Sequence, residues 1–172
     1  TWCSGAAFQH DIILGFAHEN IDGDHAMSGV LYESPYNKDS FAAFTFAEGR
    51  YSFEFDDPSG AIRKAAEAGG SGFMQFGLIR NGETVMGINR PRVRCYRTLA
   101  ELNGHLCFID SIRMIQFADF MKELHRLGVT NALYMDMGAG WNYSWYRNAA
   151  EKVVTLFSLP VPWSHNWIVF RK

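Results

Sequence analysis

Short apolar or aromatic segments that end at turn residues make up most of this chain of 172 residues. Such segments are typical of β-strands, because bulky side chains pack well on a pleated sheet and Gly, Pro, Asn and Asp interrupt it. We expect strands at residues 11–17, 27–34, 41–47, 51–55, 72–80, 84–87, 93–102, 105–110, 131–135, 152–158 and 167–171. Aromatic residues are 15% of the chain, which agrees with a fold built mainly of sheet.

Two-residue turns indicate that neighbouring strands pair as antiparallel hairpins. Asn103-Gly104 separates two of the predicted strands, and Asn81-Gly82 and Glu48-Gly49 stand in similar places. Asn and Gly tolerate the left-handed backbone that tight hairpin turns need. We therefore expect a mixed, mainly antiparallel sheet.

Two segments have helical rather than strand periodicity. Residues 58–68 follow Asp57, a good N-cap, and begin with Pro58, which suits the first helical turn. Residues 115–127 place apolar side chains on one helical face and end at Gly128. With two principal helices, no repeat and no linker, residues 1–172 are expected to form a single α+β domain.

The charge pattern and the absence of known motifs exclude several functional classes. A net charge of −2 gives no broad basic field for nucleic acid or an anionic membrane. Pro160 and Pro162 interrupt the uncharged stretch 153–170, so no transmembrane segment is expected. The chain also lacks the motifs of serine hydrolases, P-loop enzymes, zincins and dinucleotide enzymes. We expect no cofactor, and the sequence leaves the oligomeric state open.

The three cysteines are too far apart for a zinc-ribbon or thioredoxin-like site. Cys3, Cys95 and Cys107 include no C-x-x-C pair, and their odd number argues against a disulfide framework. A Cys95–Cys107 bridge stays open as an alternative if their strands are neighbours. The chain begins at Thr1 without a methionine or a signal peptide, which favours a mature or trimmed product.

Asp136 is the strongest candidate for a chemical role. It directly follows a predicted strand and is followed by Met137-Gly138-Ala139-Gly140, so a backbone or a substrate can approach it closely. Four aromatic residues come next: Trp141, Tyr143, Trp145 and Tyr146. Aromatic planes beside a carboxylate suit a sugar ring. The alternative is a capped loop whose aromatic residues pack into the core.

Two further segments supply candidate site residues. A glycine-rich stretch around Gly72, Phe73 and Gln75 enters a strand, and its simpler interpretation is a helix stop followed by a buried strand. Arg97 lies in a basic run, on the face of its strand that is otherwise apolar. Because an unpaired buried charge is very costly, Arg97 needs an anionic partner, either a phosphate or Asp136.

An acidic and histidine-rich cluster follows the first predicted strand. His18-Glu19 and Asp22-Gly23-Asp24-His25 contain metal-ligating side chains but lack the spacing of a calcium loop. We favour a solvated turn built on Asp-Gly over a metal site. Asp110 and Asp136 are further possible cation ligands without a fixed spacing, and no metal is expected to be required.

Four motifs occur in an order that a known family shares. They are Gly70-Ser71-Gly72-Phe73, the turn Asn81-Gly82, Arg97-Thr98-Leu99-Ala100, and the run from Leu127-Gly128 to Met135-Asp136-Met137-Gly138. Over residues 61–171 the chain resembles the phosphodiester glycosidase family, which includes the enzyme that uncovers mannose 6-phosphate on lysosomal glycoproteins. The chain departs from the family at two places. Family members have Asn before the first glycine pair, where this chain has Gly69 or Gly70. They have Gly-Gly-Gly-Ser after the aspartate, where this chain has Met137-Gly138-Ala139-Gly140.

The resemblance implies hydrolysis of a sugar-1-phosphodiester or a related glycan. Asp136 is then the nucleophile, the general base or the electrostatic partner of the cationic ring, and Arg97 neutralises the phosphate. The implied substrate-binding residues are Gly72, Phe73, Gln75, Gly138, Gly140, Trp141 and Tyr143. The alternative is a non-enzymatic glycan-binding protein on the same scaffold, which the departures favour. The resemblance also implies a secreted, periplasmic or cell-surface protein.

Arg97 and Asp136 form the pair on which the catalytic interpretation depends. We predict that they lie within about one side-chain length of each other, in a cleft edged by Trp141 and Tyr143.

Overall fold

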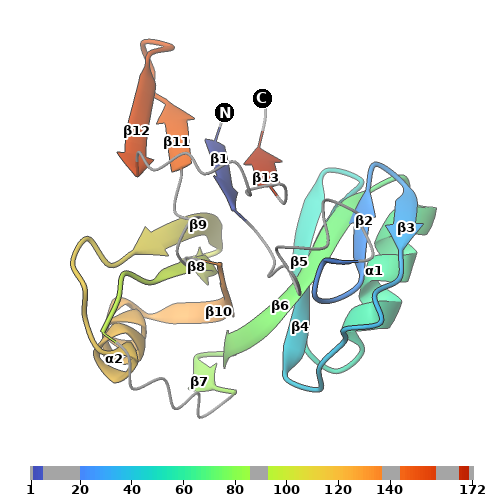
Figure 1. Cartoon of the computed structure of the whole chain (residues 1–172), viewed down its shortest axis with the longest axis horizontal. Helices are drawn as coiled ribbons and strands as arrows, with labels where there is room; N and C mark the ends of the chain where they lie inside the picture. The colour runs from blue at the N-terminus through green and yellow to red at the C-terminus, as the bar shows by residue number, and fades with distance from the viewer. Residues whose placement is uncertain (1, 6–19, 86–92, 137–143, 158–166, 171–172) are drawn as a thin grey trace.

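The computed structural model describes residues 2–5, 20–85, 93–136, 144–157 and 167–170, and its strands form two antiparallel sheets (Figure 1). The large sheet has nine strands. They are β2 (His25–Met27), β3 (Val30–Tyr32), β4 (Phe41–Ala47), β5 (Arg50–Glu54), β6 (Ser71–Arg80), β7 (Glu83–Thr84), β8 (Arg97–Leu102), β9 (His105–Asp110) and β10 (Val129–Tyr134). The small sheet contains β1 (Trp2–Gly5), β11 (Ser144–Arg147), β12 (Val153–Phe157) and β13 (Trp167–Phe170).

The long strand β6 is the centre of the large sheet. It pairs with β2, β4, β7 and β10, and β10 continues through β8 to β9. The small sheet has the order β12-β11-β1-β13, so the first and last strands of the chain lie side by side. The expected α+β domain with a mainly antiparallel sheet is confirmed.

The two predicted helices are present with slightly different ends. Helix α1 (Pro58–Glu67) begins at an Asp57 cap whose carboxylate accepts the Gly60 amide. Helix α2 (Phe117–Leu127) ends at Gly128, which has the left-handed φ of 82°. It starts two residues later than predicted, because Ile115 exchanges two backbone hydrogen bonds with Arg94 instead.

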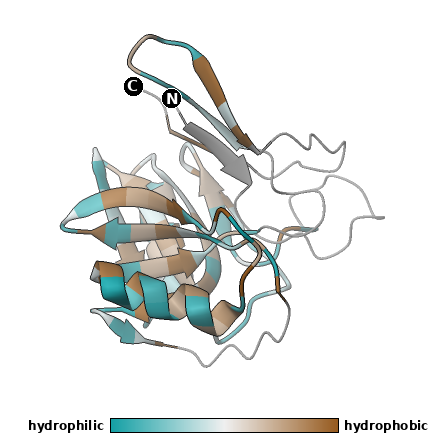
Figure 2. Ribbon diagram, turned by 90° about the vertical axis from the view of Figure 1, so that its left-hand side faces the viewer, coloured by the Kyte–Doolittle hydropathy of each residue, from teal (hydrophilic) through white to brown (hydrophobic). Residues whose placement is uncertain are grey.

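Both helices cover the same face of the large sheet. Met74 of β6 packs with Ile62 of α1, and Phe76 contacts both this cluster and the one that α2 forms. Helix α2 inserts apolar side chains into the second cluster, and its outer side carries broad hydrophilic bands (Figure 2).

The opposite face of the sheet is rich in aromatic residues and meets the small sheet. Phe44 and Phe73 pack there with Leu99, Leu133 and Met135. From β13, the half-buried Ile168 and Phe170 pack against them. The two sheets are therefore joined through an apolar contact on the face away from the helices.

Several predicted strands have different boundaries in the structure. Residues 27–34 form the end of one strand and a second one, because Ser28 and Gly29 adopt positive φ and turn the chain. The predicted strand 93–102 begins only at Arg97, and residues 144–147, for which the sequence predicts no strand, form β11. The predicted strand 11–17 lies outside the described residues.

Cys95 and Cys107 are both free thiols, so the Cys95–Cys107 bridge is not formed. No helix within the described part of the chain is long and apolar enough to span a membrane.

Candidate functional site

Arg97 is the centre of a buried polar network. It is the first residue of β8, stands opposite Asp110 in the hairpin and has no exposed surface. Its Nε and Nη2 donate to the two carboxylate oxygens of Asp110 at 2.6 and 2.7 Å. Nη2 also donates to Ser144 Oγ at 2.8 Å. Arg97 and the Asp110 carboxylate thus form a bidentate pair, the arrangement in which an arginine–carboxylate interaction is strongest.

Asp110 is an anionic partner of Arg97 in addition to the two that the sequence predicts, a phosphate or Asp136. The turn at Asn103-Gly104 contains the signal for this pair. A two-residue turn fixes the register of a hairpin, and in this register Arg97 stands directly opposite Asp110. Ser144 is also a new member of the site, and it has no signal in the sequence because it comes from the other sheet.

Asp136 lies two residues beyond the last residue of β10, where the backbone still runs beside Arg97. Its side chain is buried, with a residue exposure of 5%. The preceding amide, that of Met135, donates to the Arg97 carbonyl at 3.0 Å and continues the β10–β8 pairing. Asp136 is therefore one residue beyond a direct backbone bond to Arg97. The predicted distance between the two side chains stays a prediction.

Arg97 also contacts the chain on both sides of residues 137–143. Met135 precedes this segment and bonds to the backbone of Arg97, and Ser144 follows it and bonds to the guanidinium. The candidate residues Gly138, Gly140, Trp141 and Tyr143 lie within the segment, outside the described residues. Met135 and Ser144, which lie on either side of this segment, are thus both bound to Arg97.

The candidate residues of β6 have clear packing roles. Phe73 is buried in the aromatic cluster of the large sheet. A Cβ at Gly72 would lie 2.7 Å from the Phe44 carbonyl oxygen, so the close approach of β4 accounts for this glycine. Both observations agree with the simpler interpretation of a buried strand.

Gln75 has a buried amide that is only half satisfied. It has no exposed surface, and its Oε1 accepts the Phe76 amide at 2.8 Å. Among the described residues its Nε2 has no hydrogen-bond partner, and a buried donor without a partner costs about 1–3 kcal/mol. Gln75 is two residues beyond Phe73 in β6, so both side chains point to the same face of the sheet. Leu99 of β8 and Met135 also pack on this face.

The acidic cluster forms a buried turn rather than the solvated one that we expected. Asp22 and Asp24 are 4% and 5% exposed. The amide of Ser34 and the side chain of Asn37 both donate to Asp24 Oδ1, and Lys38 forms an ion pair with Asp22. Among the described residues no group of three His, Cys, Asp or Glu side chains could hold a metal ion. His18 and Glu19 lie outside them.

A separate hollow of about 300 Å³ lies between α1 and the β4–β5 hairpin. None of the sequence-predicted site residues lines it.

No family model matches the chain, and none of the curated proteins matches it either.

Proposed function

We propose that this protein hydrolyses a sugar-1-phosphodiester or a related glycan, with Asp136 as the reacting carboxylate. The observation that supports the proposal best is the burial of Asp136 at a strand end, one residue from the backbone bond between Met135 and Arg97. A carboxylate on a rigid strand end keeps its position during a reaction. The segment that follows carries the aromatic residues suited to a sugar ring.

The chemistry needs few further groups. The group that leaves a sugar-1-phosphodiester is a phosphate monoester, which is a good leaving group, so the bond to the sugar breaks with less help from an acid than in an alkyl glycoside. Asp136 would attack the anomeric carbon or remove a proton from the attacking water. In either role it must be ionised, and it would stabilise positive charge that develops on the ring.

Arg97 is in this proposal a positioning residue rather than the main phosphate ligand. Asp110 already occupies two of its N–H groups, and Ser144 accepts a further hydrogen bond. By contacting both Met135 and Ser144, Arg97 would hold Asp136 and the aromatic residues in a fixed relation. Gln75 and Tyr143 are proposed to bond sugar hydroxyls, and Trp141 to stack on the ring.

A second candidate function is glycan binding without turnover. The observation that favours it is that Asp110 balances the charge of Arg97 before any phosphate arrives. In this case the aromatic residues bind the sugar, and Asp136 accepts hydrogen bonds from its hydroxyls.

Turnover of a panel of α- and β-linked sugar-1-phosphodiesters separates the two candidates. We expect Asp136→Asn to lower kcat by at least about 10²-fold while binding is retained, because a catalytic base or nucleophile is removed. Asp119→Asn, at an acidic residue in the first turn of α2, is the matched control and should keep full activity.

Each outcome of this panel decides between the candidates. Unchanged turnover in Asp136→Asn would remove Asp136 from the mechanism. Glycan binding without turnover would favour the second candidate, and the absence of both would exclude the two together. Activity is expected to persist in a chelator, since no metal is proposed. A secreted, periplasmic or cell-surface location goes with the proposed substrate.

A further inference from the structure

We propose that the segment between β9 and α2, residues 111–116, binds the surface of a membrane that contains anionic lipids. The segment lies at one end of the longest axis of the molecule, at the left-hand edge of Figure 1. It includes none of the residues of the proposed sugar site, and its role does not depend on the proposed hydrolysis.

The backbone of this segment forms a bulge. At its start, Ser111 donates its amide to the Tyr96 carbonyl at 2.8 Å. At its end, Ile115 and Arg94 exchange two backbone hydrogen bonds. Between these two pairings, residues 112–114 stand against a single residue of the neighbouring chain segment, so three residues span the distance that one residue spans. The extra residues therefore leave the line of the strand.

The apolar side chains of the bulge are exposed. Ile112 is 91% exposed, more than any other large hydrophobic residue that the structure describes, and Met114 is 64% exposed. Val93, next to the base of the bulge, is 45% exposed. A rigid partner needs pockets that fit such projecting side chains, whereas the boundary between lipid headgroups and acyl chains adapts to them.

The same part of the chain carries an excess of positive charge. Residues 90–122 contain six Lys and Arg against three Asp and Glu, although the whole chain has a net charge of −2. The balance stays positive when the buried Asp136, which follows β10 beside Arg97, is counted as well. The basic charge is thus local, and the net charge of the chain does not reveal it.

Two arginines of the bulge are available to a ligand. Arg113 is exposed between Ile112 and Met114, and Arg94 lies at the base of the bulge. In the described parts of the chain, neither arginine forms an ion pair or a side-chain hydrogen bond. Their guanidinium groups can therefore bind the phosphates of lipid headgroups.

The combination of apolar tip and cations favours a lipid surface over an acidic protein. Ile112 and Met114 would enter the boundary of the acyl chains, while Arg94 and Arg113 bind the headgroups above it. An arginine suits this depth, because its apolar stem can lie along the lipid while its charged end stays at the surface. An acidic protein would balance the arginines but would leave the apolar tip in water.

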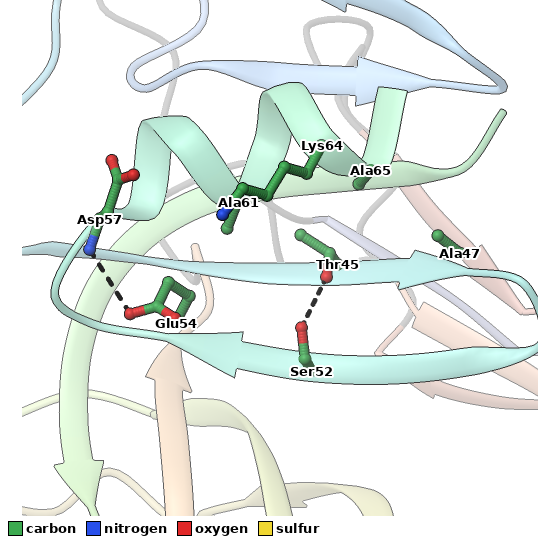
Figure 3. Close-up of a pocket in the computed structure, with 8 residues that line it drawn as sticks. All are labelled: Thr45, Ala47, Ser52, Glu54, Asp57, Ala61, Lys64 and Ala65. Atoms are coloured by element: carbon green, nitrogen blue, oxygen red, sulfur yellow. Dashed lines mark hydrogen bonds between the residues drawn. The ribbon is translucent and has the colours of Figure 1, made fainter. Parts of the chain in front are cut away.

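The opposite edge of the large sheet exposes apolar side chains without such cations. Met27 and Val30, on the β2–β3 hairpin, are 53% and 51% exposed, and residues 20–37 contain three acidic residues and no Lys or Arg. The hollow beside α1 (Figure 3) has no positive excess either, because two acidic residues and one lysine line it. The β2–β3 hairpin therefore offers a matched apolar control.

The first test is sedimentation of the purified protein with phosphatidylcholine vesicles that contain about 30% phosphatidylserine. We expect the wild type to bind, and Ile112→Ser/Met114→Ser to bind at least about tenfold more weakly, because two apolar side chains no longer enter the lipid. Met27→Ser/Val30→Ser should bind like the wild type. All four side chains are mostly exposed, so both double variants should keep the circular dichroism spectrum of the wild type.

A second pair of variants tests the charges. Arg94→Gln/Arg113→Gln should weaken binding to the anionic vesicles at least about tenfold, because two contacts to charged headgroups are lost. Its weaker binding to pure phosphatidylcholine should equal that of the wild type. Arg50→Gln/Lys64→Gln removes two cations from β5 and α1 and should leave binding to both kinds of vesicle unchanged.

Three outcomes would overturn the proposal. The first is that the wild type does not bind anionic vesicles. The second is that Ile112→Ser/Met114→Ser binds them as tightly as the wild type. The third is that polyglutamate binds as tightly as the vesicles and depends on the arginines alone, which would assign the segment to an acidic protein instead.

Discussion

At the scale of single residues, Arg97 determines much of the stability of the candidate site. Its guanidinium is fully buried and its partner Asp110 is largely so. We predict that Arg97→Ala lowers the free energy of unfolding by about 3–5 kcal/mol, because it leaves a carboxylate without its partner in a mostly apolar region. Urea unfolding followed by circular dichroism measures the change.

Arg63→Ala is the matched control for this prediction. The pair Arg63–Glu33 is exposed, so its loss should cost only about 0–1 kcal/mol. A similar small loss in Arg97→Ala would mean that water enters the network and that Arg97 does not hold it together.

The Cys107 thiol makes the stability of the protein depend on pH in the alkaline range. Burial raises the pKa of its thiol, so the unfolded chain, in which the thiol ionises near about pH 8.5, loses this proton first. The contribution of this thiol to the free energy of unfolding is therefore fully present below that pH. It is lost as the pH rises toward the pKa of the folded state.

We therefore predict that the free energy of unfolding falls more steeply above about pH 8.5 in the wild type than in Cys107→Ala. The pKa of Tyr51 is also raised, by burial and by Glu101, and this second effect should persist in the variant. Urea titrations at several pH values measure both slopes. Parallel slopes would show that Cys107 is as accessible to solvent in the folded protein as in the unfolded chain.

At the scale of elements, the start of α2 is incompletely capped. The N-cap Gln116 has the extended backbone that suits a cap, yet its side chain makes no capping hydrogen bond. We predict that Gln116→Ser stabilises the protein by about 0.5–1 kcal/mol, because the hydroxyl can accept an orphan amide of the first turn.

Thermal unfolding measures this gain, and Gln116→Ala should show none of it. At the other helix, Asp57→Ala should lose about 1 kcal/mol, since its capping bond is already formed. Equal stability of the serine and alanine variants would contradict the capping argument.

Elements that local turn chemistry defines could be predicted from the sequence. β4 and β9 have the predicted boundaries, and the turn at Asn103-Gly104 has φ values of 52° and 71°. Elements that depend on distant partners could not. Ile115 has the spacing of a helical residue but bonds to Arg94, and β11 forms because β1 and β12 lie on either side of it.

The candidate site was predictable to the same degree. Arg97 and Asp136 both stand next to apolar strand residues in the sequence, and both are buried in the structure. The Arg97–Asp110 pair could have been found from the hairpin register. Ser144 could not, because only the packing of two sheets brings it to Arg97.

At the scale of the whole molecule, Phe170 joins the two sheets. Its ring centroid lies 5.9 Å from that of Phe108 and 6.2 Å from that of Phe44 in the large sheet. We predict that Phe170→Ala lowers the free energy of unfolding by roughly 2 kcal/mol, less than for a fully buried ring. Hydrogen exchange should then show the small sheet opening before the large one.

Val169 provides the comparison on the same strand. Its side chain is 42% exposed, so Val169→Ala should change stability by less than about 0.5 kcal/mol. If both variants cost the same, the joint between the sheets does not depend on the ring of Phe170.

The pairing of β1 with β13 has a mechanical consequence. Trp2 stands opposite Phe170, and Gly5 stands opposite Trp167, in an antiparallel ladder. Tension applied to residues 2 and 170 therefore acts across this ladder from one end and loads one hydrogen-bonded pair at a time. The hydrogen bonds between the two strands then break one after another, starting at Trp2 and Phe170. This sequential rupture needs less force than shearing, in which all the hydrogen bonds of the ladder carry the load together. The pairing of β1 with β13 is therefore weakest against a force that separates residues 2 and 170.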